Sequence, residues 1–185
     1  MSRRLVILDR DGVINQDSDD FIKAPDEWIP IPGSLEAIGR LSRAGFEVAI
    51  ASNQSGLGRK LLDEPALEMI HRKMRAAARE FGGDIGKIAY CPHRPDAGCD
   101  CRKPKPGLLL TLSRKYGVPL NNVPFIGDSV RDVEAAIAVG ARAILVQTGS
   151  GAESQSVVAE RGLDVEVFAD LAAAVDQLVE EAGHS

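Results

Sequence analysis

The chain has 185 residues, of which 44% are hydrophobic and 26% are charged, a composition typical of one globular domain. Its 27 acidic residues outnumber 22 Lys and Arg, and the resulting net charge of -5 disfavours a nucleic-acid binder. No segment approaches the ~20 apolar residues of a membrane span, and the apolar run behind the basic N-terminus is too short for a secretory signal, so we expect a cytoplasmic protein without a membrane partner.

Short apolar runs alternate with amphipathic segments along the chain, which predicts strands separated by helices. The most strongly patterned helix begins near Pro65, ends at Gly82-Gly83 and has an apolar face formed by Leu67, Ile70, Met74, Ala78 and Phe81. In chain order we expect strands over residues 4–8, 46–51, 85–90, 123–126 and 143–147, a short strand over 165–168, and helices over residues 33–44, 64–81, 106–116, 129–139, 153–160 and 170–181.

Strands that alternate with helices favour a mostly parallel sheet with helices on both faces. We therefore predict an α/β protein whose residues 1–185 form a single domain, since the chain shows no repeat, no low-complexity tract and no linker. Two connections are long, at residues 11–32 and 91–105. Loops of this length in a compact domain are more often functional than idle.

Polar residues follow three of the predicted strands. The first strand ends in Asp9-Arg10-Asp11-Gly12, the second in Ser52-Asn53 and the fourth in Gly127-Asp128, with Asp132 four residues later. Ligands of parallel sheets bind beyond the carboxyl ends of the strands, and residues i and i+2 of an extended chain project to the same side, so we expect these carboxylates to converge. Converging carboxylates need a cation, and their hard oxygen ligands suit Mg²⁺. An alternative role for Asp132 is to complete a helix capping box with Ser129.

A second cluster of possible metal ligands lies in the second long connection. Three thiols and one imidazole occur within eleven residues, at Cys91, His93, Cys99 and Cys101. This is a common tetrahedral set for structural Zn²⁺, and a reducing cytoplasm favours metal over disulfide. Zinc would order a loop at about residues 91–103 and aim Arg102 and Lys103 at the strand ends. The alternative is three free thiols in a flexible loop.

The strand-end motifs resemble those of the haloacid dehalogenase superfamily of phosphatases. The superfamily's Asp-x-Asp-Gly motif is matched by Asp9, Asp11 and Gly12, and its Ser or Thr after the second strand by Ser52. Its lysine is matched by Lys103, with Lys105 as the rival, and its acidic pair by Asp128 and Asp132. The resemblance covers roughly residues 4–148 and implies a three-layer Rossmann-like fold with no large cap domain.

The resemblance also implies a two-step phosphoryl transfer. Asp9 would form an aspartyl-phosphate, and Asp11 would protonate the leaving oxygen and then accept a proton from water, for which we expect a raised pKa. Lys103 would neutralise the charge of the reacting groups. The implied catalytic residues are Asp9, Asp11, Ser52 and Lys103, and the implied magnesium ligands are Asp9, the backbone carbonyl of Asp11, and Asp128, with Asp132 in a supporting role.

The cysteine loop narrows the resemblance to one subgroup of the superfamily, which contains heptose bisphosphate phosphatases and histidinol-phosphate phosphatase domains. The stretches Asn53-Gln54-Ser55-Gly56 and Pro104-Lys105-Pro106-Gly107 are similar to the heptose enzymes. The resemblance implies Mg²⁺-dependent removal of the 7-phosphate of D-glycero-D-manno-heptose 1,7-bisphosphate, a step toward the nucleotide-activated heptose of lipopolysaccharide and other surface polysaccharides. Histidinol phosphate is the alternative substrate. A flap at about residues 12–32 would help to shape the pocket, and the implied substrate-binding residues are Asn53, Gln54, Ser55 and Arg102.

Other classes of protein fit the residues less well. A response-regulator module would carry its acceptor aspartate after the third strand, where Tyr90-Cys91 stands. A DNA-end phosphatase would need a basic, aromatic groove. A zinc-stabilised interaction protein would not need Asp9 or Asp11. The sequence leaves open the preferred anomer of the sugar and whether the acidic run from Asp17 to Asp20 is a solvated surface or binds sugar. We expect a monomer with a small-molecule substrate.

Overall fold

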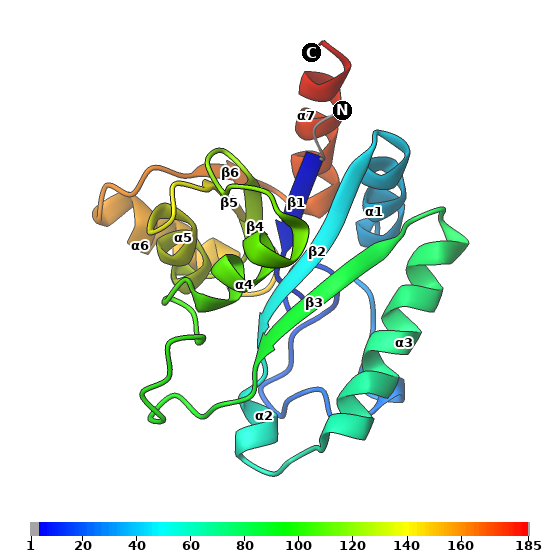
Figure 1. Cartoon of the computed structure of the whole chain (residues 1–185), viewed down its shortest axis with the longest axis vertical. Coiled ribbons are helices and arrows are strands. Elements are labelled where there is room, and N and C mark those ends of the chain that lie inside the picture. Colours follow the sequence, from blue (N-terminus) through cyan, green and yellow to red (C-terminus); the bar gives the residue numbers. More distant parts are fainter. Residues whose placement is uncertain (1–3, 185) are drawn as a thin grey trace.

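The computed structural model of the chain describes residues 4–184 (Figure 1). Within them, six strands form one wholly parallel sheet in the order β3-β2-β1-β4-β5-β6. The strands are β1 (Arg4–Leu8), β2 (Phe46–Asn53), β3 (Ile85–Cys91), β4 (Pro124–Gly127), β5 (Arg142–Val146) and β6 (Glu166–Phe168). The order places β1 between β2 and β4, and this arrangement brings together the strand ends that carry the polar motifs.

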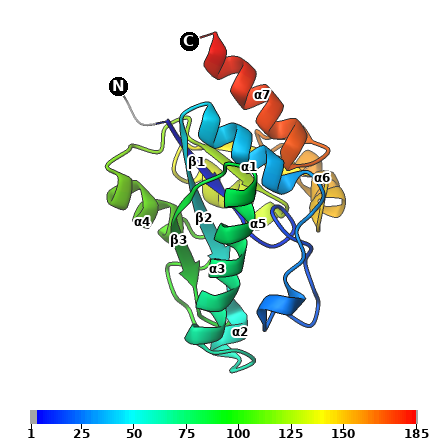
Figure 2. The same ribbon diagram turned by 90° about the vertical axis from the view of Figure 1, so that its right-hand side faces the viewer.

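Helices cover both faces of the sheet, so the architecture has the three layers that the alternation predicted. The helices α1 (Ser34–Arg43), α3 (Glu64–Glu80) and α7 (Leu171–Gly183) enclose one apolar core, and α4 (Gly107–Tyr116), α5 (Val130–Ile137) and α6 (Gly151–Glu160) enclose the other. Figure 2 shows α1 and α3 in front of the sheet. The strands themselves are buried on both faces, as continuous apolar runs such as Val6 to Leu8 require.

Every predicted strand and helix is present, with shifts of one or two residues at most ends. Two short elements have no counterpart in the prediction: α2 (Ser55–Gly58) and a 3-10 turn η1 (Pro25–Glu27). A single turn is too short to show a hydrophobic period. Phe81 was assigned wrongly to the buried face of α3, because it follows the last helical residue and is 39% exposed.

Both long connections leave the carboxyl ends of strands. The first, between β1 and α1, is packed against the domain: Trp28 is buried, and Lys73 Nζ of α3 donates to the backbone oxygen of Trp28 at 3.0 Å. Ser34 Oγ donates to Ile14 O at 2.6 Å and holds the other end. The second connection leads from β3 to α4 and contains the cysteines.

Among the described residues, no helix is both long enough and apolar enough to cross a bilayer.

Candidate active site

The candidate site lies where β1, β2 and β4 end side by side. Asp9 and Asp128 follow β1 and β4, and a cavity of about 380 Å³ opens above them. Gly12 has a φ of +81°, and a Cβ at this position would collide with Asp128 Oδ2, so only glycine allows the two loops to approach this closely. The charged side chains that line the cavity are Asp9, Asp11, Asp17, Arg59, Arg102, Lys103, Asp128, Arg131 and Asp132.

Three carboxylates meet at the bottom of the cavity. Asp9, Asp128 and Asp132 are buried, and each offers an oxygen within 4.8 Å of the others. Burial, and then the charge of Asp132, raises the pKa of Asp9 well above its ordinary value and the pKa of Asp128 to about 7. Buried anions at this spacing repel one another unless a cation joins them. The all-oxygen donor set fits a hard divalent cation such as Mg²⁺.

The structure distinguishes Lys103 from its rival. The Nζ of Lys103 lies 2.7 Å from Asp132 Oδ1 and 3.1 Å from Asp9 Oδ1, and it donates to Ala51 O at 2.9 Å. Burial lowers the pKa of Lys103, but the carboxylates of Asp132 and Asp9 more than offset this, so the ammonium stays charged. Lys105 instead lies on the surface, where its Nζ donates to Cys99 O at 3.0 Å.

Asp132 has both of the roles that the sequence left open. Its Oδ2 accepts from the backbone N–H of Ser129 at 3.1 Å, and Ser129 Oγ accepts from the N–H of Asp132 at 3.3 Å, which completes a capping box at the start of α5. Its other oxygen pairs with Lys103. The cap therefore fixes the carboxylate that orients the lysine.

Asp11 differs from the prediction. Its carboxylate is not part of the three-carboxylate group but accepts hydrogen bonds from Arg10, Asn15 and Gln54. Burial raises the pKa of Asp11, but the guanidinium of Arg10 and the hydrogen bonds from Asn15 and Gln54 outweigh this and hold the pKa below its ordinary value. The expected raised pKa is therefore wrong for this conformation. Sequence spacing placed Asp11 beside Asp9 but gave no sign of the buried donors around it.

The residues at the end of β2 differ in whether their side chains face the cavity or bind other parts of the chain. Ser52 is buried, and its Oγ accepts from Gln54 Nε2 at 2.7 Å. Asn53, expected at the substrate, uses both ends of its amide on the backbone of Lys103: Asn53 Oδ1 accepts from the N–H at 3.1 Å, and Nδ2 donates to the carbonyl at 3.2 Å. Ser55 lines the cavity. Asn53 thus fixes the position of the lysine, a contact that no sequence pattern revealed.

Three arginines stand at the rim of the cavity. Arg102 is half-buried, and its Nη1 is buried with no hydrogen-bond partner among the described residues. Burial, and then the charges of Arg131 and Arg59, lowers the pKa of Arg102. Mutual repulsion of this kind indicates that the three guanidinium groups face a common space. Sequence reasoning found Arg102 but missed Arg131, whose place next to Asp132 in the first turn of α5 was the available signal.

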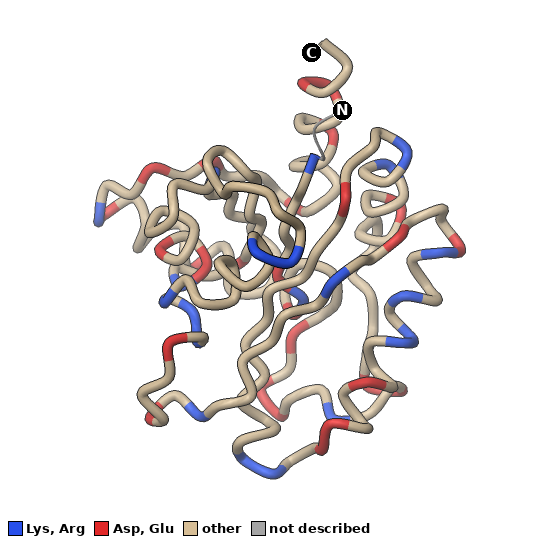
Figure 3. Tube along the Cα trace, in the orientation of Figure 1, with Lys and Arg blue, Asp and Glu red and all other residues tan. Residues whose placement is uncertain are grey.

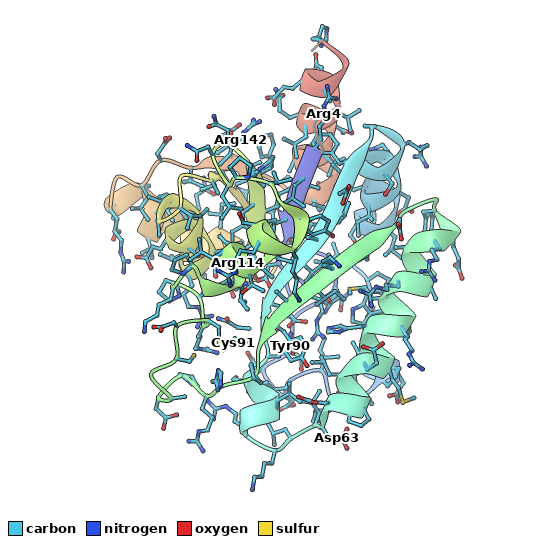
Figure 4. All side chains as sticks on the ribbon, viewed as in Figure 1. Arg4, Asp63, Tyr90, Cys91, Arg114 and Arg142 are labelled. Atoms are coloured by element: carbon cyan, nitrogen blue, oxygen red, sulfur yellow. The ribbon has the colours of Figure 1, made fainter. Side chains whose placement is uncertain are left out.

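The four predicted zinc ligands form one cluster at the end of β3, beside the labelled Cys91 (Figure 4). Cys91 Sγ lies 3.7 Å from Cys99 Sγ, and His93 Nδ1 lies 3.2 Å from Cys101 Sγ and 3.5 Å from Cys91 Sγ. In tetrahedral zinc sites with Zn–S bonds of ~2.3 Å, ligand atoms lie about 3.5–3.8 Å apart. The cluster therefore fits Zn²⁺, with histidine binding through Nδ1.

Comparisons with known proteins agree with this geometry. A family model described as HAD-hydrolase-like matches residues 100–174. The D-glycero-beta-D-manno-heptose-1,7-bisphosphate 7-phosphatase of Pseudomonas aeruginosa is 53% identical over 180 residues, which are 97% of this chain and 100% of that protein. The enzyme of the same name from Bordetella bronchiseptica is 51% identical over 97% of this chain and 99% of its own.

Solved structures give the same result. The crystal structure of D,D-heptose 1,7-bisphosphate phosphatase from B. bronchiseptica, complexed with magnesium and phosphate, superposes with a TM-score of 0.91 at 51% identity and covers 96% of this chain and 99% of that one. The corresponding phosphatase from Burkholderia thailandensis superposes with a TM-score of 0.75 at 37% identity, over 96% of this chain and 99% of that one.

Proposed function

The chain belongs to the haloacid dehalogenase-like hydrolases, within the family of D-glycero-β-D-manno-heptose-1,7-bisphosphate 7-phosphatases, and on this basis we propose that it hydrolyses the 7-phosphate of this sugar bisphosphate. The observation that carries the proposal is the buried group of Asp9, Asp128, Asp132 and Lys103 beneath a rim of three arginines. The names of the relatives favour the β anomer, which the sequence had left open.

Asp9 is the nucleophile of this proposal, and Asp11 the acid and base. In the first step an oxygen of Asp9 bonds to phosphorus, the bond from phosphorus to the sugar oxygen breaks, and Asp11 gives its proton to that oxygen. In the second step water attacks phosphorus, its proton passes to Asp11, and inorganic phosphate leaves Asp9. The two steps restore both aspartates to their starting states.

The other buried groups balance charge. Asp9, Asp128 and the backbone carbonyl of Asp11 would hold Mg²⁺, which neutralises charge between the anionic nucleophile and the anionic phosphate. Lys103, at 3.1 Å from Asp9, neutralises the nucleophile and the transferring oxygens. Ser52 Oγ accepts from Gln54 and so keeps its own O–H free to donate to a phosphoryl oxygen.

A substrate with two phosphates explains the rim of the cavity. Arg59, Arg102 and Arg131 have no carboxylate partner among the ion pairs of the described residues, although the chain as a whole is acidic. Forked guanidinium groups bind phosphate in a bidentate manner. We assign the second phosphate, at carbon 1, to these arginines, with Arg102 as the central contact.

The zinc cluster has a structural role in this proposal. All four ligand positions are filled by protein atoms, which leaves no open position for chemistry. Cys101 directly precedes Arg102 and Lys103, so binding of Zn²⁺ would fix the chain that delivers both cations to the cavity.

Competing functions receive less support. The alternative substrate, histidinol phosphate, has one phosphate and leaves the arginine rim without a ligand. Figure 3 shows basic and acidic residues spread over the whole trace, with several Lys and Arg in succession along α3. The net charge of -5 disfavours a nucleic-acid substrate. We retain a cytoplasmic location and a role in nucleotide-activated heptose synthesis as part of the proposal.

The test is phosphate release in the presence of Mg²⁺ from three substrates in parallel: the α and β anomers of D-glycero-D-manno-heptose 1,7-bisphosphate, and histidinol phosphate. We expect the β anomer to give the highest kcat/KM. Asp9→Asn should reduce release to background with an unchanged circular dichroism spectrum. Preference for histidinol phosphate would overturn the substrate, and an active Asp9→Asn variant would overturn the nucleophile.

A further inference from the structure

Arg10 separates the two aspartates of the first motif and is the least exposed charged residue of the site. It is 0% exposed and is not among the residues that line the cavity. Its backbone is fixed at both ends: its N–H donates to Asp9 Oδ1 at 2.7 Å, and its carbonyl accepts from the N–H of Ile14 at 2.9 Å. Burying a guanidinium is costly unless it is paired. The partners of Arg10 must therefore offset the cost of its burial.

Those partners surround the carboxylate of Asp11. Arg10 Nε donates to Asp11 Oδ1 at 3.0 Å and Nη2 to Oδ2 at 3.2 Å, so the guanidinium grips both oxygens. Asn15 Nδ2 adds a bond to Oδ1 at 3.0 Å, and Gln54 Nε2 adds one to Oδ2 at 3.0 Å. Four donors occupy the roughly four lone-pair sites of a carboxylate. In this conformation both oxygens of Asp11 are occupied by donors.

The same group is connected to the phosphate side of the site. Arg10 Nη2 also donates to Gln54 Oε1 at 3.3 Å, and Gln54 Nε2 donates to Ser52 Oγ at 2.7 Å as well as to Asp11. Movement of Ser52 Oγ toward a phosphoryl oxygen would lengthen its bond from Gln54 Nε2 and shift the Gln54 amide. Loss of that donor would leave an Asp11 oxygen free to take a proton from solvent water and pass it to the leaving oxygen.

We propose that Arg10 is a positioning residue for proton transfer, which acts with Asn15 and Gln54 to hold the Asp11 carboxylate in a resting position from which it turns to serve as acid and base. The inference rests on the proposed function, since it takes Asp11 to be the acid and base. Arg10 contacts neither the leaving oxygen nor the attacking water, so it acts only through Asp11. Lysine cannot replace it, because one ammonium does not grip both carboxylate oxygens.

The test compares two phosphate esters in Arg10→Lys. The sugar bisphosphate has an alkoxide leaving group that needs a proton, whereas p-nitrophenyl phosphate releases a stable phenolate that does not. General acid–base catalysis contributes ~10²–10⁴-fold, so we expect kcat for the sugar bisphosphate to fall by about 10²-fold. The first turnover of p-nitrophenyl phosphate should change by less than about fivefold and be followed by a slow steady state, because breakdown of the aspartyl-phosphate still needs the base.

Two further variants complete the experiment. Asn15→Ala removes one donor and should give the same pattern with a loss of about tenfold, which keeps the test available if Arg10→Lys does not fold. Arg75→Lys is the matched control, since Arg75 is a part-buried arginine whose guanidinium donates to the backbone oxygens of Ile85 and Gly86, away from the site. It should leave both esters unaffected.

The outcomes separate this inference from the proposed function. An equal loss in the first turnover of both esters would make Arg10 merely structural, and an unchanged kcat for the sugar bisphosphate would remove its role altogether. If the wild type hydrolyses p-nitrophenyl phosphate but not the sugar bisphosphate, the substrate is wrong while Arg10 can be tested on glycerol 2-phosphate, another alkyl ester. If the wild type hydrolyses neither ester with Mg²⁺ present, both proposals fail.

Discussion

At the scale of single residues, four aspartates with the same side chain acquire different properties from their neighbours. Asp9 and Asp128 are buried among other carboxylates, and their pKa values are raised. Asp11 lies among cationic and amide donors, and its pKa is lowered. Asp132 is fixed by its own helix cap against Lys103. Environment thus distinguishes the carboxylates that we propose as metal ligands, as acid and base, and as the support of Lys103.

The raised pKa of Asp128 predicts a pH-dependent affinity for magnesium. Burial and Asp132 raise this pKa to about 7, so below that pH the metal must displace a proton from Asp128. Because the pKa of Asp9 is raised as well, the affinity should fall at least about tenfold for each pH unit. Above about pH 8 the contribution of Asp128 should level off. Titration calorimetry with Mg²⁺ alone, between about pH 5.5 and 8.5, measures this directly.

Asp26→Asn, in the exposed 3-10 turn, is the control and should keep the same slope. An affinity that stays constant from pH 5.5 to 7 would show that Asp128 is not a ligand whose proton the metal displaces.

The sequence pointed to polar residues at the strand ends, but it did not reveal the residues that hold those side chains in place. Asp9, Ser52 and Asp128 could be found because a strand end fixes where a side chain lies. The bidentate contact of Arg10 with Asp11 could not be predicted, because an arginine between two aspartates is equally compatible with a solvated side chain. Asn53 was predicted to bind the substrate, but both ends of its amide bind the backbone of Lys103, a contact made across 50 residues.

At the scale of elements, the loop between β3 and α4 contributes Arg102 and Lys103 to the proposed chemistry. Its middle is shaped by the Cys/His cluster, and its end by Asn53. Gly107, at the start of α4, packs where a Cβ would collide with the backbone oxygen of Asp100, so the loop folds closely over the helix. Cysteine spacing revealed this loop, whereas the single-turn α2 was too short to predict.

Since the Cys/His cluster and Asn53 hold different parts of the loop, we can predict the effect of removing one cysteine of the cluster. Cys99→Ala should lower the zinc content below one per chain and reduce the melting temperature. Because Arg102 adjoins the cluster while Lys103 remains tied to Asn53, KM for the sugar bisphosphate should rise more than kcat falls. Metal analysis, thermal unfolding and steady-state kinetics measure the three effects.

Asp96→Ala, in the same loop but outside the cluster, should change none of them. A zinc content that remains at one per chain in Cys99→Ala would show that the ligand set is wrong.

At the scale of the whole molecule, the order of strands creates the site. Alternating elements predicted the parallel sheet, but the position of β1 between β2 and β4 follows from packing of whole layers, which no local pattern encodes. The same order explains why residues more than 100 apart in the sequence, such as Asp9 and Asp128, line one cavity.

The distribution of exposed apolar side chains is relevant to the prediction that the protein is a monomer. Among the described residues, the large exposed apolar side chains are scattered along the chain, namely Ile29, Leu61, Met69, Phe81, Leu110 and Ile137. Single apolar residues of this kind are normal on monomers. Light scattering coupled to size-exclusion chromatography should therefore give the mass of one chain over the concentrations used for kinetics. A dimer mass that persists on dilution would contradict this.

The hydrogen bonds between Asn53 and Lys103 determine where the loop between β3 and α4 can change in length. Cys91 belongs to a strand and Lys103 is pinned to the neighbouring strand's end, so both ends of the intervening chain are fixed independently of its length. Residues 94–98 lie between the two pairs of residues of the Cys/His cluster and are exposed. Insertions and deletions there should leave Lys103 in place, so we expect this stretch to be where related chains differ in length and where a foreign peptide can be inserted.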